Sequence, residues 1–271
     1  MNGHARRIKK IAAAAFFYAA CQAFLNTPLH AQDARANIRF VKPLVLADYS
    51  QATAFTNLGG MSGGDENNPG TLHVTVEHDD GLVLGNAGYA LGIDYDVRNL
   101  GEYTFYWIKL GKERQGTSGV TDTLDLKKYN YLSFWIRDGG NTGNIKIEVH
   151  QDSDSDGVFN YGKDLTSFVY MNAYVKGGAV QKEWSKVIIP LKFFSTITDW
   201  SKAHELVFVF ENKTGNTQGV VYIDEIIFGN RPDDVLFAAD DAVIPVKEPD
   251  AASFRVDDAE VKDCLLFKGT N

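Results

Sequence analysis

Cysteine, long apolar segments and basic side chains are scarce in this sequence, and each shortage excludes a class of structure or partner. Two cysteines, Cys21 and Cys264, occur among the 271 residues. Cys21 lies in an N-terminal segment that we expect to be removed, so Cys264 is left without a second cysteine for an intrachain disulfide. Any fastening of the fold beyond side-chain packing must then come from another source, such as a metal ion.

The N-terminal segment, residues 1–31, has the layout of a secretory signal peptide. Four basic side chains between residues 6 and 10 precede an apolar run over residues 11–24. This run is too short to cross comfortably a hydrocarbon core about 30 Å thick. The sequence therefore predicts cleavage after Ala31 and a secreted protein, periplasmic or extracellular. Lipid attachment at Cys21, which ends the stretch "YAAC", is the alternative.

Acidic side chains outnumber basic ones, and removal of the signal peptide widens the difference. The chain has 35 acidic and 27 basic side chains; loss of residues 1–31 takes away four basic and no acidic ones, so the net charge becomes 23 minus 35, or −12. A surface of this sign repels phosphate backbones and anionic lipid. The charge therefore predicts neutral ligands and divalent cations as partners, with no nucleic acid and no membrane span.

Catalytic motifs are also missing. The sequence contains no H-E-x-x-H or G-x-S-x-G pattern, and the glycine-rich stretch over residues 57–64 lacks the G-K-[ST] ending of a phosphate-binding loop. A glycoside hydrolase would need two carboxylates at a fixed separation, and the many acidic residues allow too many pairs for any one to be predicted. We therefore expect a protein that is not an enzyme. An accessory part of a glycoside hydrolase remains the alternative.

Strand-like alternation runs through the rest of the chain. Ten segments alternate apolar and polar side chains or are rich in β-branched and aromatic types, and clusters of Gly, Asn, Asp and Ser separate them. They are residues 39–46, 72–78, 89–97, 103–110, 131–138, 144–150, 167–175, 185–191, 205–212 and 220–228. Helical turns are expected at residues 124–130 and 198–204. Short strands without long helices between them predict an all-β fold, an antiparallel β-sandwich of the jelly-roll kind, over residues 32–230.

The composition changes after this predicted domain. Residues 231–271 hold ten acidic and five basic side chains and three prolines. Such a composition is typical of an acidic tail or of a linker. An appended or partner enzyme is therefore a further expected partner.

The order of the segments carries a family resemblance. The stretches "TNLGG" near residue 58, "EWSKVIIPL" over 183–191 and "VVYIDEIIF" over 220–228 stand in the same order as in the carbohydrate-binding modules with a galactose-binding-like jelly roll. The sequence is most similar to family 11, whose members bind β-glucans, and the resemblance covers residues 44–229. It implies non-catalytic binding of a β-glucan or a related plant or microbial polysaccharide. A calcium-stabilised structural or adhesion domain without a sugar ligand is the alternative.

Side-chain parity along two strands suggests where a sugar would bind. In residues 131–138 and 144–150, one set of alternate positions is apolar and should face the core: Leu132, Phe134, Ile136, Ile145, Ile147 and Val149. The opposite positions hold Trp135, Arg137, Glu148 and His150. If these two strands pair, they place an aromatic platform beside polar groups.

Sugar recognition needs this combination, because the axial C–H groups of a pyranose pack on an aromatic ring while its hydroxyls need directional partners. Further aromatic candidates are Tyr106, Trp107, Tyr170 and Tyr174. The alternative for each aromatic, Trp107 and Trp135 included, is that it fills the core or covers a sheet edge.

The stretch "DSDSDG" predicts a metal site between two strands. Asp152, Asp154 and Asp156 occupy the first, third and fifth positions of an EF-hand calcium loop, and Val158 would contribute its carbonyl. The twelfth position holds Lys163 in place of the bidentate glutamate, which lowers the expected affinity. The alternative is an acidic, solvated hairpin tip.

The resemblance implies a second structural calcium. In the jelly rolls that this sequence resembles, such an ion joins the first and last strands through acidic side chains. Asp48 in "VLADYS" and Asp224 in "YIDEI" occupy the comparable stretches. Carboxylate oxygens suit calcium, and a metal between the chain ends would take the place of a disulfide. The alternative is that Asp224 caps a turn or pairs with a lysine.

Overall fold

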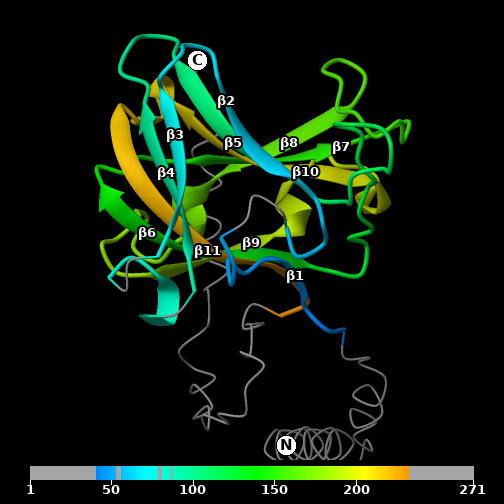
Figure 1. The fold of residues 1–271 in the computed structure, drawn as a ribbon, viewed down its shortest axis with the longest axis horizontal. Coiled ribbons are helices and arrows are strands. Elements are labelled where there is room, and N and C mark those ends of the chain that lie inside the picture. Colours follow the sequence, from blue (N-terminus) through cyan, green and yellow to red (C-terminus); the bar gives the residue numbers. More distant parts are fainter. Residues whose placement is uncertain (1–40, 53–55, 79–80, 87, 232–271) are drawn as a thin grey trace, which may run out of the picture. The chain divides into compact units, whose positions relative to one another are not determined.

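The computed structural model describes residues 41–52, 56–78, 81–86 and 88–231. Within them, eleven strands form two antiparallel sheets, each named here after its central strand (Figure 1). The β11 sheet has the order β3 (Leu72–Glu77), β4 (Ala90–Asp96), β11 (Gln218–Gly229), β6 (Tyr131–Gly140) and β9 (Ser185–Pro190), and β1 (Leu44–Ala47) also pairs with β11. The β10 sheet has the order β2 (Ser62–Glu66), β5 (Tyr103–Lys109), β10 (Ala203–Glu211), β7 (Lys146–Gln151) and β8 (Leu165–Tyr170).

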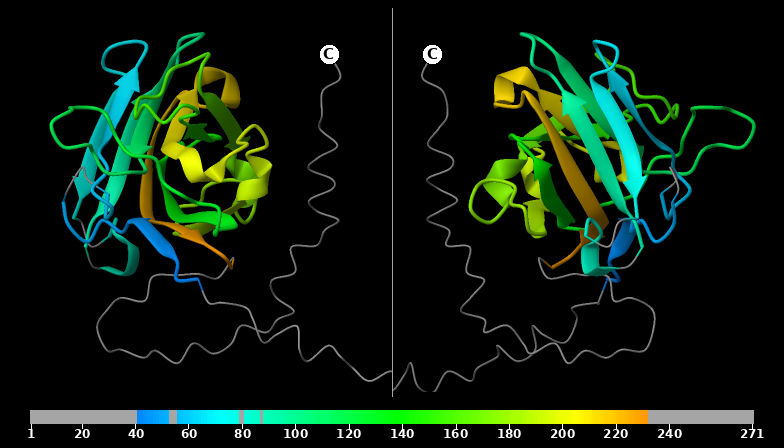
Figure 2. Two further views of the ribbon diagram at one scale, coloured as in Figure 1. Left: turned by 90° about the vertical axis from the view of Figure 1, so that its right-hand side faces the viewer. Right: turned by 60° about the vertical axis from the view of Figure 1, so that its left-hand side comes forward.

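Short 3-10 helices connect some of the strands. They are η2 (Leu84–Asn86), η3 (Met171–Tyr174), η4 (Leu191–Phe193), η5 (Trp200–Lys202) and η6 (Asn212–Thr214). The expected helical turn at residues 198–204 is confirmed by η5, whereas residues 124–130 contain a turn without a helix. Figure 2 shows β11, in orange, beside the blue-green β4 from two further sides.

The core lies between the two sheets and is built by the alternation that the sequence displays. All six side chains predicted to face it are fully buried. Phe134 of β6 meets Phe208 of β10 edge-on, with ring centroids 5.3 Å apart, and Tyr95 of β4 stacks on Phe210 at 4.3 Å. Burial of each large apolar side chain contributes roughly 1.5–3 kcal/mol, so these contacts between the sheets hold the two layers together. The predicted β-sandwich is confirmed.

Each of the ten predicted segments contains a strand. The strand that was not predicted is β2, "SGGDE", because glycine and acidic residues are depleted in strands. Its backbone pairs with β5 in spite of its composition, with Gly63 opposite Trp107. The segment 167–175 is a strand only as far as Tyr170, and η3 follows it.

One prediction about pairing is wrong. Strands β6 and β7 do not pair, since β6 lies between β11 and β9 whereas β7 lies between β10 and β8. The short connection over residues 141–145 crosses from one sheet to the other instead of turning back in the same sheet. The outward-facing residues of β6 and those of β7 therefore lie on opposite outer faces of the sandwich.

Several predictions concern the two ends of the chain, which the structure does not describe. The signal peptide, its alternative lipid site at Cys21, Cys264 and nearly all of the acidic tail lie outside the described residues. Among the residues that are described, no helix has the length and apolar character needed to cross a membrane.

Candidate functional site

The outer face of the β10 sheet, called the β10 face below, brings aromatic and charged side chains together in rows across the strands. One row contains Gly63, Trp107, Val207, Glu148 and Phe168, from β2, β5, β10, β7 and β8 in turn. The next row contains Asp65, Phe105, Val209, Lys146 and Tyr170. A third contains Lys109, Glu205, His150 and Thr166, and Tyr103 lies opposite Glu211 at the end of β5.

These residues point outward because their neighbours along each strand are core residues. Leu206, Phe208 and Phe210 of β10 are fully buried between the sheets, so Val207 and Val209 must face the other way. The two valines are nevertheless only 2% and 5% exposed, since larger side chains on the flanking strands cover them. They form an apolar floor between two aromatic groups.

Trp107 and Phe168 stand on either side of this floor. A Cβ added to Gly63 would lie 2.7 Å from Cζ2 of Trp107, so the indole lies over the glycine of the edge strand. On the far side, Phe168 and Tyr170 are 49% and 38% exposed, with ring centroids 5.6 Å apart. The β10 face thus offers aromatic surfaces to solvent at two separate places.

Charged side chains cross the same floor and are paired with one another. Lys146 Nζ contacts Glu148 at 2.9 Å and Glu211 at 2.7 Å. His150 lies between two carboxylates, with Nδ1 2.8 Å from Glu205 and Nε2 3.1 Å from Glu148. The pairing holds these long side chains in fixed positions, so their remaining lone pairs and protons are oriented before any ligand arrives.

The pairing also determines the charge of the carboxylates. Burial alone would raise the pKa of Glu205, but the hydrogen bond from His150 and the charge of Lys109, which contacts the same carboxylate, lower it to about 2. Burial likewise opposes charge on Glu148, and its bonds to His150 and Lys146 still bring its pKa below the usual value. Both carboxylates are therefore ionised hydrogen-bond acceptors at neutral pH.

The loop over residues 152–164 places two aromatic rings beside this network. Phe159 stacks on His150 with ring centroids 4.0 Å apart and an angle of 21°. Tyr161 meets Phe159 edge-on at 4.8 Å and is 77% exposed. The loop therefore extends the aromatic surface of the β10 face beyond the edges of the strands.

Four of the eight predicted ligand residues lie on the β10 face: Trp107, Tyr170, Glu148 and His150. Tyr106 was also expected to face a ligand, and that placement is wrong. It points into the core with the opposite parity to Trp107, and its hydroxyl donates to Ser62 Oγ at 2.6 Å.

The other three predicted residues lie elsewhere. Tyr174 belongs to η3 and packs near Phe193, with centroids 5.7 Å apart, because the strand ends at Tyr170. Trp135 and Arg137 lie on the β11 sheet, since β6 does not pair with β7. Arg137 there donates to the Lys182 carbonyl at 2.7 Å. The predicted grouping of Trp135 and Arg137 with Glu148 and His150 is therefore wrong.

Several residues of the β10 face were not predicted: Tyr103, Phe105, Lys109, Lys146, Phe159, Tyr161, Phe168, Glu205 and Glu211. A signal for some of them exists in "YTFYWIKL", where Tyr103, Phe105 and Lys109 share the parity of Trp107. In "ELVFVFE" the bulky side chains at 206, 208 and 210 identify the core parity and leave the two glutamates outside. Which strands stand side by side could not be read from either stretch.

The acidic loop brings its three aspartates together as predicted. One carboxylate oxygen from each of Asp152, Asp154 and Asp156 lies within 4.8 Å of the others. Lys163 contacts Asp154 and lies 3.0 Å from Asp156. The oxygens suit a calcium ion, and the Lys163 ammonium already supplies positive charge at two of them. Calcium binding in this loop stays a prediction.

The carboxylate of Asp152 and the carbonyl of Val158 accept hydrogen bonds from within the loop. Both oxygens of Asp152 accept backbone N–H groups, from Ser155 and Gly157, each at 2.7 Å. The Val158 carbonyl accepts from the Asn160 side chain at 3.1 Å, and Val158 itself is 41% exposed. Internal hydrogen bonds and Lys163 can therefore shape this loop together, and a cation would have to compete with them.

Asp48 and Asp224 are also neighbours, where β1 pairs with β11. Asp224 is 3% exposed, and burial, with the nearby charges of Glu225 and Asp48, raises its pKa to about 7. The N–H of Glu225 donates to Asp224 Oδ1 at 2.7 Å from a left-handed backbone with φ of 48°. A buried carboxylate whose pKa is raised by burial and by neighbouring acidic groups fits a divalent cation. That calcium too stays a prediction.

Comparison with known proteins identifies the family to which this chain belongs. A model of the family described as carbohydrate binding domain 30 matches residues 67–230. This chain belongs to that family. The match covers more than half of the chain and includes β3 to β11. The resemblance to carbohydrate-binding modules with a jelly-roll fold is thereby confirmed, and the protein is a non-catalytic carbohydrate-binding module.

Comparison with solved structures found further similar proteins, of which a family 30 module has a similar fold. A family 30 carbohydrate-binding module is 19% identical and has a TM-score of 0.50, over 70% of this chain and 100% of that one. The family 11 module of a cellulosomal cellulase of Clostridium thermocellum is 16% identical, with a TM-score of 0.47 over 70% of this chain and 96% of that one. A β-1,2-glucanase from Parabacteroides distasonis is 18% identical, with a TM-score of 0.44 over 70% of this chain and 24% of the enzyme. No curated protein matches the chain.

Proposed function

We propose that the β10 face binds a β-glucan. The observation that carries this proposal is the row in which Trp107 and Phe168 stand on either side of Val207 and Glu148. The three strand spacings from β5 to β8 span about 14 Å, the length of a short stretch of linked sugar rings. A chain laid along this row would meet aromatic surface at both ends and charged acceptors between them.

The chemistry of β-linked glucose suits such a surface. All hydroxyls of the β-glucopyranose ring are equatorial, so both ring faces present axial C–H groups that pack on aromatic rings. The hydroxyls at the ring edge would reach Glu148, Glu205 and Lys146, whose positions are fixed by their ion pairs. Since the acidic groups are compensated by Lys109, Lys146 and His150, the face needs no ionic ligand, which favours a neutral polysaccharide.

The proposal extends to where the protein acts and what it accompanies. The signal-like N-terminal segment supports secretion, and polysaccharides of this class are extracellular substrates. A module that binds without cleaving would serve to hold a partner enzyme on its substrate. Structural calcium at Asp48 and Asp224 is part of the same proposal and is tested separately below.

The test is calorimetric titration of the purified protein with soluble β-glucans, mannans and xylans. The variant Trp107→Ala should weaken glucan binding by about 1–3 kcal/mol, as other stacked aromatic contacts do. The matched control, Trp135→Ala, removes an indole from the opposite sheet and should leave this binding in place. Binding that survives Trp107→Ala unchanged would contradict the β10 face. A protein that binds none of the glycans would support a structural or adhesion domain instead.

A further inference from the structure

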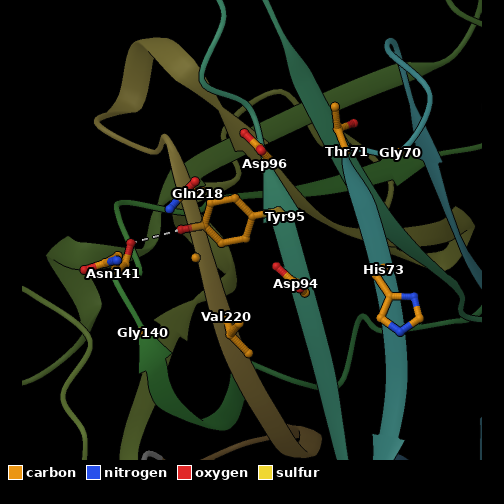
Figure 3. Close-up of a pocket in the computed structure, with 11 residues that line it drawn as sticks. Gly70, Thr71, His73, Asp94, Tyr95, Asp96, Gly140, Asn141, Gln218 and Val220 are labelled. Carbon is orange, nitrogen blue, oxygen red and sulfur yellow. Dashed lines mark hydrogen bonds between the residues drawn. The ribbon is translucent and has the colours of Figure 1, made fainter.

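The outer face of the β11 sheet carries a hollow that the β10 face does not explain. It has a volume of about 500 Å³ and lies at one end of β3, β4, β11 and β6 (Figure 3). Its lining includes the polar side chains of His73, Asp94, Asn141 and Gln218. Because the two sheets lie back to back, this hollow opens on the side of the sandwich opposite to Trp107.

One row of side chains crosses the hollow from four strands. His73 lies opposite Asp94, and Val220 lies beside both Asp94 and Gly140. Gln218 precedes Val220 by two residues on β11 and lies on the same face. The side chains of His73, Asp94 and Gln218 are exposed, and none makes a hydrogen bond or ion pair with another described residue. They therefore offer hydrogen-bonding groups to a ligand without breaking any existing contact.

An aromatic side chain, Tyr222, occupies the next row of the same face, two residues along β11 from Val220, which lines the hollow. Tyr222 lies between Gly92 of β4 and Arg137 of β6. A Cβ added at Gly92 would lie 3.3 Å from its Cε1, and one added at Gly139 would lie 2.7 Å from its Cε2 and 2.8 Å from Cγ1 of Val220. The two edges of the ring thus lie over glycines on both sides, so the half-buried ring lies across the sheet.

The same arrangement of an aromatic ring over a glycine of the neighbouring strand occurs on the β10 face, where Trp107 lies over Gly63. In both places a glycine on a neighbouring strand leaves room for an aromatic ring to lie along the sheet. A basic residue lies next to each ring: Lys109 beside Trp107, and Arg137 opposite Tyr222. The two outer faces of the sandwich therefore repeat one combination of groups.

We infer that the outer face of the β11 sheet is a second carbohydrate-binding site, with Tyr222 as its stacking platform and His73, Asp94 and Gln218 as its hydrogen-bonding groups. The inference uses the family's carbohydrate ligand class but not the proposed role of the β10 face. The ligand is a neutral sugar chain, because Asp94 and Asp96 line the hollow. The nearby cations are already engaged: Arg98 is paired with Asp96 at 2.6 Å, and Arg137 donates to the Lys182 carbonyl at 2.7 Å. Two sites on opposite faces would let one module join two polysaccharide chains.

The experiment titrates a soluble β-glucan oligosaccharide into the full-length protein and follows backbone amide shifts by NMR. We expect two sets of shifted residues, one around Trp107 and one around Tyr222. Tyr222→Ala should weaken only the second set by about tenfold or more, equivalent to the loss of one stacked contact. Tyr222→Phe, which keeps the ring, should retain it. Melting curves establish that each variant is folded.

The outcomes separate this inference from the proposed function. If Tyr222→Ala leaves every shift unchanged, or if Trp107→Ala abolishes all binding, the second site is refuted and the β10 face stands. If Trp107→Ala changes nothing while Tyr222→Ala removes binding, the β10 face is refuted and the second site stands. Addition of the wild-type protein to a long soluble β-glucan should also raise turbidity by crosslinking, and Tyr222→Ala should not.

Discussion

At the scale of single residues, Gly63 controls the position of an aromatic ring that it does not itself carry. The variant Gly63→Ala should tilt the Trp107 indole away from β2, because the added methyl would lie 2.7 Å from Cζ2. We expect β-glucan affinity to fall by about fivefold or more, while the free energy of unfolding changes by less than about 1 kcal/mol on this exposed edge strand. Calorimetry and denaturant unfolding measure the two quantities. Unchanged affinity would mean that Trp107 is not a platform.

Glu205 links the candidate site to the stability of the sheet. Its pKa is about 2 in the folded protein and near 4.5 when unfolded, so its ionised form stabilises the fold above pH 5. That contribution, roughly 3 kcal/mol from the difference in pKa, is lost as the pH falls toward 2. Glu205→Gln, which does not titrate, should therefore be less stable than wild type at pH 7, and the gap should narrow in acid. Urea unfolding at several pH values measures this gap, and one that widens in acid would contradict the assignment.

At the scale of one element, the 152–164 loop shows how a lysine can stand where a metal loop has its last ligand. Lys163→Glu removes the ammonium that contacts Asp154 and Asp156 and places a carboxylate at the twelfth position. We expect this variant to bind calcium more tightly than wild type, and hydrogen exchange over residues 152–164 to slow when calcium is added. Lys163→Gln is the control, since it removes the charge without adding a ligand. Absence of calcium binding in both variants would show that the loop is a solvated hairpin tip.

At the scale of the whole molecule, Asp48 and Asp224 lie where β1 and β11, the first and last strands along the chain, pair. If calcium binds there, stability rises with its concentration, by about 2.7 kcal/mol at a hundredfold excess over Kd. Asp224→Asn should lose this gain in calcium. In EDTA the same variant should match or exceed the stability of wild type, because it removes a buried charge beside two others. Melting temperatures in the two buffers measure the crossover, and parallel shifts of both proteins would contradict a calcium site at this pair.

Local patterns were sufficient to predict most of the strands and which of their side chains face the core. The alternation in "YLSFWIRD" and "NIKIEVH" correctly placed Phe134 and Ile147 inside, because a strand presents successive side chains to opposite faces whatever its partners are. The same reasoning failed at Tyr174, where the chain leaves the strand for a 3-10 turn. It also missed β2, whose glycines pair with β5 through their backbone alone.

The sequence by itself determined the fold class, the strand segments, the family resemblance and the proximity of the three aspartates in one loop, since each depends on neighbours along the chain. The candidate site depended on the tertiary structure. Trp107, Val207, Glu148 and Phe168 form one row because β5, β10, β7 and β8 stand side by side, although their order along the chain is different. Trp135 and His150 face opposite sides because a five-residue connection crosses between the sheets, and a crossing and a hairpin can share one local sequence pattern. Strand order is decided by how two apolar faces close over a common core, which is a property of the whole chain.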